Sequence, residues 1–101
     1  MIIKEGVNIQ GLKLEMRPVL MYANRIWKKH GKELAITSGM DGTHHASSLH
    51  YYGYAVDLRT RYFSDKEKQT IASELKHMLG DGYDVITEKD HIHAEYQAIL
   101  W

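Results

Sequence analysis

Residues 48 to 57 read Ser-Leu-His-Tyr-Tyr-Gly-Tyr-Ala-Val-Asp, and residues 91 to 96 read His-Ile-His-Ala-Glu-Tyr. Side chains two residues apart on a β-strand point to the same face of the sheet. This alternation predicts a strand in which Asp57 faces one side while its apolar neighbours face the core. It also predicts a second strand in which His93 shares a face with His91 and Glu95. If the two strands are neighbours, Asp57 and His93 can converge on one point.

The rest of the chain predicts further helices and strands around these two. Apolar residues at helical spacing indicate a first helix, with Pro18 tolerated in or near its first turn. A second helix begins at Ser64, where the Ser64 hydroxyl and Glu67 can form a capping box. Helices are therefore predicted over residues 14 to 30 and from residue 64 up to the glycine at 80, and strands over residues 33 to 38, 54 to 60, 83 to 88 and 91 to 96.

The expected fold class is α+β, with a small antiparallel sheet flanked by two main helices. The last two strands read as an antiparallel hairpin across the polar turn near Lys89 and Asp90. A chain of 101 residues buries enough surface to fold as a single unit, so residues 1 to 101 are expected to form one domain. Residues 1 to 13 are the least clearly assigned part of the chain.

The charge balance and the absence of cysteine limit the partners and the metal ligands. Lys and Arg number 13, as do Asp and Glu, and this balance disfavours a nucleic-acid partner because such a partner needs a basic face. Without cysteine, disulfides and thiolate metal sites are excluded, which leaves histidine and the carboxylates as strong ligands. Seven histidines form the one compositional bias of the chain.

Hydrophobic patterning gives an expectation about location. Residues 1 to 6 lack both the apolar run and the small-residue cleavage site of a signal peptide. No stretch approaches the ~20 apolar residues of a membrane span. We therefore expect a protein that is made in the cytoplasm and does not insert into a membrane. The sequence makes no prediction about the oligomeric state.

Three side chains in the two opening stretches form a candidate metal site. Two imidazoles, His50 and His93, and one carboxylate, Asp57, leave a tetrahedral zinc ion with an open position, as in a catalytic site. Gly53 can adopt the backbone angles that fold the loop carrying His50 back over the strand. The competing interpretation is a set of histidines partnered by a carboxylate in an ordinary core. Manganese, cobalt and nickel also accept this ligand set.

The same residues resemble a known family. The pattern Ser-x-His-x-x-Gly-x-Ala-x-Asp followed by His-x-His is similar to that of the zinc D-alanyl-D-alanine carboxypeptidases and L-alanyl-D-glutamate endopeptidases, whose fold is shared with the hedgehog signalling domain. The likeness spans residues 33 to 97 and is strongest for small phage-encoded members. It implies that His50, Asp57 and His93 bind zinc, and that the reaction is metal-assisted amide hydrolysis of peptidoglycan stem peptides.

The resemblance also implies roles for the residues beside the metal ligands. The family commonly places a catalytic acid or base three positions before its last zinc ligand, and Asp90 occupies that position here. Glu88 remains a competitor, because the hedgehog-like branch places its acid farther upstream. His91 resembles the residue that hydrogen-bonds the substrate or the developing oxyanion.

Substrate binding is where the chain departs from the family. Many members carry Ser-Gly-Tyr-Arg, with the arginine on a substrate carboxylate, whereas residues 38 to 41 read Ser-Gly-Met-Asp. Arg59 and Arg61 follow the Asp57 strand and are candidates to supply the missing cation. Ser48 is expected to support the loop or a ligand, and Tyr52 to line the substrate cleft.

Two functional classes follow from these expectations. The first is a zinc metallopeptidase of cell-wall peptides, either a carboxypeptidase or an endopeptidase. A phage endolysin released by a holin suits an enzyme without a signal peptide, and a cell-wall remodelling enzyme is the other setting. The second class is a catalytically silent zinc-binding recognition module of the same fold. The sequence does not decide which peptide bond is cut.

Overall fold

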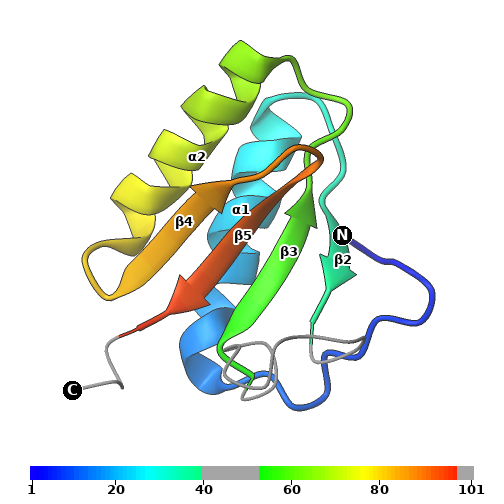
Figure 1. Cartoon of the computed structure of the whole chain (residues 1–101), viewed down its shortest axis with the longest axis vertical. Helices are drawn as coiled ribbons and strands as arrows, with labels where there is room; N and C mark the ends of the chain where they lie inside the picture. The colour runs from blue at the N-terminus through cyan, green and yellow to red at the C-terminus, as the bar shows by residue number, and fades with distance from the viewer. Residues whose placement is uncertain (40–52, 98–101) are drawn as a thin grey trace.

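Two helices cover one face of a five-stranded sheet in the computed structural model, which describes residues 1–39 and 53–97 (Figure 1). The strand order is β1-β2-β3-β5-β4. This arrangement confirms the predicted α+β class. In chain order the elements are β1 (Ile2–Ile3), the 3-10 helix η1 (Leu14–Met16), α1 (Arg17–Lys29), β2 (Ala35–Ser38), β3 (Ala55–Arg59), α2 (Asp65–Leu79), β4 (Tyr83–Thr87) and β5 (His91–Tyr96).

The sheet is mixed, which corrects the prediction of an antiparallel sheet. Strands β2, β3, β5 and β4 pair antiparallel, whereas β1 pairs parallel to β2 with Ile2 opposite Ala35 and Ile3 opposite Ile36. A parallel pair needs a long crossover connection, and here that connection contains α1. A strand of two residues is too short to carry an alternating pattern, so periodicity alone does not detect β1.

The first helix begins later than its apolar pattern predicts. The prediction places its start at Leu14, but residues 14–16 form a 3-10 turn and α1 begins at Arg17 with Pro18 in its first turn. An α-helix running through Leu14 would bring the proline ring against the carbonyl of that residue, four positions earlier. The chain avoids this clash by turning more tightly before the proline.

The second helix begins as its sequence predicts. The Ser64 side chain accepts a hydrogen bond from the Glu67 amide at 3.1 Å, and the Glu67 carboxylate accepts one from the Ser64 amide at 3.0 Å. Together they form the predicted capping box, which satisfies two amides that the helix leaves unpaired. Ile71 and Leu75 are fully buried and hold α2 against the sheet. Within the described residues, no helix is long and apolar enough to cross a membrane.

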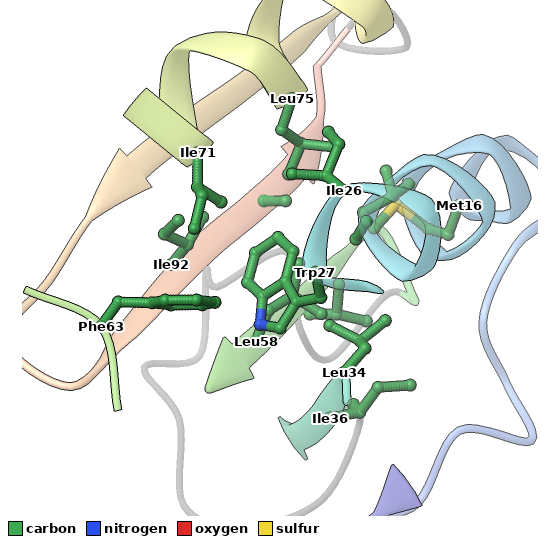
Figure 2. Close-up of a cluster of buried hydrophobic side chains, with 14 residues drawn as sticks. Met16, Ile26, Trp27, Leu34, Ile36, Leu58, Phe63, Ile71, Leu75 and Ile92 are labelled. Atoms are coloured by element: carbon green, nitrogen blue, oxygen red, sulfur yellow. The ribbon is translucent and has the colours of Figure 1, made fainter. Parts of the chain in front are cut away.

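The core lies between the two helices and the sheet, with Trp27 of α1 near its centre (Figure 2). Its indole is fully buried, and it meets the Phe63 ring edge-on with the two ring centroids 6.0 Å apart. The indole Nε1 donates a hydrogen bond to the carbonyl of Arg59 at 2.9 Å. Trp27 therefore both fills the core and fixes the end of β3.

Replacing Trp27 with alanine is expected to lower the free energy of unfolding by about 3–5 kcal/mol. The loss is large because it combines a cavity with a broken hydrogen bond to the Arg59 carbonyl, and a domain of this kind is stable by only ~5–15 kcal/mol. Trp27→Phe keeps a buried ring and is expected to cost clearly less. Urea unfolding followed by circular dichroism measures both. A loss under about 1 kcal/mol for the alanine variant would contradict the central packing role.

Candidate metal centre and catalytic site

The site lies on the sheet face opposite the helices, where β3 and β5 run side by side (Figure 1). In this antiparallel pair Asp57 stands opposite His93, and Arg59 stands opposite His91. We call this surface, made by Asp57, Arg59, His91, His93 and Glu95, the site face. The predicted convergence is confirmed, because the Asp57 Oδ1 and His93 Nδ1 atoms are 3.0 Å apart.

The spacing of these two atoms suits a bound zinc ion. Two ligand atoms of a tetrahedral zinc site lie roughly 3.3 Å apart, given zinc to ligand distances of about 2.0–2.2 Å. The Asp57 and His93 side chains are only 15% and 18% exposed, so water competes weakly with a metal there. The predicted third ligand, His50, lies outside the described residues. Within residues 1–39 and 53–97, no group of three His, Asp or Glu side chains is placed to hold a metal ion.

His93 is held from both sides of its ring. Its Nδ1 faces Asp57, and its Nε2 is 2.6 Å from the Oε1 atom of Glu95. The amide nitrogen of the Gln97 side chain donates to the other Glu95 oxygen at 2.5 Å. Burial lowers the pKa of His93, but the hydrogen bonds and charges of Asp57 and Glu95 outweigh burial and raise the pKa above its ordinary value. The metal-free site therefore favours a charged imidazole between two carboxylates.

This raised pKa predicts how the stability of the metal-free protein depends on pH. Because the pKa of His93 is higher in the folded than in the unfolded state, its stabilising contribution is complete below about pH 6.5, the ordinary value for histidine. The contribution is lost as the pH rises through the folded pKa. The stability difference between the wild type and His93→Ala, measured by urea unfolding with a chelator present, should shrink across this range. A difference that grows with pH would contradict the assignment.

The turn between β4 and β5 carries Asp90, the predicted catalytic carboxylate. Its Oδ1 atom is 2.7 Å from the His91 Nδ1, and this contact lowers the pKa of Asp90 below its ordinary range. The turn is fixed at two points. The Thr60 amide donates to the Asp90 carbonyl at 2.9 Å, and the Lys68 ammonium of α2 donates to the Lys89 carbonyl at 2.8 Å. Asp90 is thus a 71% exposed side chain on an anchored backbone.

A pocket on the site face brings Asp90 and Asp57 into one lining. Its volume is about 310 Å³, and Asp57, Asp90 and His91 all line it. His91 spans the distance between the two carboxylates, with its Nε2 3.8 Å from the Asp57 Oδ1. Three cationic side chains also line the pocket, and they are Lys4, Arg59 and Arg61. A small substrate in this pocket would meet the candidate general base Asp90, the candidate metal ligand Asp57 and three cations.

Glu88, the competing candidate for the base, has a different position. Its amide donates to the His91 carbonyl at 2.9 Å, and its side chain is exposed. It is not among the described residues that line the pocket. The geometry therefore brings Asp90 closer to the candidate chemistry than Glu88.

The pocket is lined both by predicted site residues and by residues that the sequence did not predict. Ser48, His50 and Tyr52 lie outside the described residues. Arg59 lines the pocket, and its role toward a substrate stays a prediction. Lys4 was not predicted, because its position depends on the parallel pairing of β1 with β2. Gln97 was not predicted either, since only a three-dimensional contact reveals that it holds Glu95.

Comparison with known proteins finds no protein-family model that matches the chain and no curated protein that matches it.

Proposed function

We propose that the protein is a zinc-dependent peptidase that hydrolyses an amide bond in peptidoglycan stem peptides. The observation that carries the proposal is the pairing of Asp57 with His93 across two strands, with Oδ1 and Nδ1 3.0 Å apart and with Asp90 on the adjoining pocket. A carboxylate and an imidazole at that spacing can provide two of the three protein ligands of a catalytic zinc site, and the second carboxylate can provide the general base.

Asp57 and His93, together with His50, are the side chains that would hold the metal. A bound zinc ion supplies a Lewis acid for the scissile carbonyl and lowers the pKa of water to about 7. Asp90 takes the proton from the attacking water and passes it to the leaving amine. In the free protein His91 keeps the pKa of Asp90 low, and a substrate that covers this exposed carboxylate excludes water and raises the pKa toward a useful value.

His91 supports the same reaction from the pocket wall. When it is protonated, its Nδ1 donates to Asp90 and its Nε2 proton remains for the carbonyl oxygen of the substrate. The cations Lys4, Arg59 and Arg61 offer charge-assisted hydrogen bonds to a carboxylate near the scissile bond. Stem peptides are rich in carboxylates, so this lining favours them over uncharged peptides. The setting that we propose is lysis or remodelling of a cell wall.

Metal removal and restoration test the proposed function. Protein freed of metal by a chelator is expected to leave synthetic stem peptides and purified peptidoglycan intact, and one equivalent of zinc is expected to restore cleavage. Mass spectrometry of the products identifies whether a carboxypeptidase or an endopeptidase bond is cut. Cleavage by the metal-free protein at an undiminished rate would contradict a metal-dependent reaction.

A zinc-binding recognition module is the second candidate, and it makes a different prediction in the same assay. The exposed position and low pKa of Asp90 are the observations in its favour, because an exposed, strongly acidic carboxylate is a poor general base on its own. A protein that binds zinc stoichiometrically but cuts no peptide bond would support the module over the enzyme.

A further inference from the structure

Glu95 lies on the site face but is not one of the proposed metal ligands. It contacts both His93 and Gln97. It lies two residues after His93 on β5, so both side chains point to the same face of the sheet. Its carboxylate is only 15% exposed, and it meets the His93 Nε2 at 2.6 Å. A largely buried carboxylate at this distance is a strong hydrogen-bond acceptor for an imidazole N–H.

We propose that Glu95 is a positioning residue that fixes His93 for metal binding through Nδ1. A neutral imidazole carries its proton on one nitrogen and has a lone pair on the other, and a metal binds only the lone pair. An acceptor at Nε2 keeps the proton there and leaves the Nδ1 lone pair directed at Asp57. The inference rests on the metal site of the proposed function, but it does not depend on peptide cleavage.

The surroundings of the two nitrogens decide which one faces the metal. On the Nδ1 side, Asp57 lines the pocket that also contains Asp90, so a substrate and water can reach that side. On the Nε2 side, the second oxygen of Glu95 is occupied by the Gln97 side chain at 2.5 Å. The reverse arrangement, with a metal between Nε2 and Glu95, would place the ion away from the catalytic carboxylate. A series of hydrogen bonds therefore runs from Gln97 through Glu95 to His93 and ends at the proposed metal position.

The zinc affinity of Glu95 variants provides the first test. Competition with a chromophoric chelator should show zinc binding by Glu95→Ala about 10- to 100-fold weaker than by the wild type, the range typical of carboxylates that support a ligating histidine. Glu95→Gln should lose less, because its amide oxygen still accepts the Nε2 proton. Thermal unfolding of each metal-free variant, followed by circular dichroism, verifies that the protein is folded.

Asp84→Ala is the matched control for charge. Asp84 is the partner of Glu95 on β4, so it presents the same charge on the same face but one strand further from His93. Its removal is expected to change zinc affinity by no more than roughly twofold, since exposed or distant charges contribute little. Equal losses for Asp84→Ala and Glu95→Ala would show a general charge effect and overturn the proposal.

Nitrogen-15 NMR of the zinc-loaded wild type provides the second test. We expect the His93 proton on Nε2 and the metal on Nδ1, with the Nε2 proton exchanging faster in Glu95→Ala. A proton on Nδ1 would overturn the proposal, as would a Glu95→Ala variant that binds zinc as tightly as the wild type. If Glu95→Ala lost as much zinc affinity as Asp57→Ala, Glu95 would be a metal ligand rather than a positioning residue, and this result would also overturn the proposal. If these tests succeed while no stem peptide is cleaved, only the proposed peptidase activity fails.

Discussion

Replacing His93 with alanine is expected to abolish both zinc binding and peptide hydrolysis. His93 would supply one of the three proposed ligands, and its Nδ1 atom lies 3.0 Å from the Asp57 Oδ1. Without it only Asp57 and His50 of the proposed set remain, which is one protein ligand fewer than a catalytic zinc site has. The loss should exceed the roughly 10- to 100-fold effect expected for a supporting group such as Glu95. Elemental mass spectrometry of the purified variant measures zinc content, and chelator competition measures affinity.

His77→Ala is the control for this variant. His77 is an exposed histidine in the last turn of α2, so its removal changes the histidine content without touching the site face. It should keep full zinc content and full activity. Since His93 also contributes to the stability of the metal-free protein, circular dichroism must show that His93→Ala is folded at the assay temperature. A folded His93→Ala protein that retains one zinc per chain would contradict the proposed centre.

Replacing Asp90 with asparagine is expected to lower kcat by about 10²–10⁴-fold while zinc content stays unchanged. Asparagine keeps the size of the side chain but cannot accept the proton from the attacking water. Because Asp90 lies in the turn outside the metal set, the variant separates catalysis from metal binding. Steady-state hydrolysis of a synthetic stem peptide gives kcat, and chelator competition gives the zinc affinity in parallel.

Glu88→Gln is the matched variant for the competing base. Its side chain is exposed and outside the described lining of the pocket, so we expect an activity within roughly threefold of the wild type, as for a general surface substitution. A large loss in Glu88→Gln together with an active Asp90→Asn would reverse the two roles. Equal losses in both would show that the two carboxylates act together.

The strands of the site could be predicted from the sequence because side chains along a strand alternate between its two faces every second residue. Residues 91 to 96 form β5 as predicted, and Asp57 stands opposite His93 because each strand needs its apolar side chains on the helix side. The capping box at Ser64 was equally predictable, because it depends on two residues three positions apart. Local patterns of this kind need no knowledge of the rest of the chain.

Other features depend on contacts that no local pattern encodes. Strand β1 has two residues, so its parallel pairing and the position of Lys4 on the pocket follow only from the whole fold. The exposure of Asp90 and its contact with His91 depend on the conformation of the turn. The hydrogen bond from Gln97 to Glu95 links side chains whose rotamers the sequence does not determine.

Within the described residues, only one face of the sheet is packed against helices (Figure 1), so the position of the site-face side chains depends on the register of β5. On β5 the buried side chains Ile92 and Ala94 alternate with His91, His93 and Glu95. A slip of β5 by one residue against β3 would turn every one of these side chains to the opposite face. Such a misfolded sheet would bury His93 and Glu95 against the helices and would also separate His93 from Asp57, two of the proposed metal ligands. A one-residue slip therefore costs stability and disrupts the site face together, so the same alternation of side chains specifies both the strand register and the site.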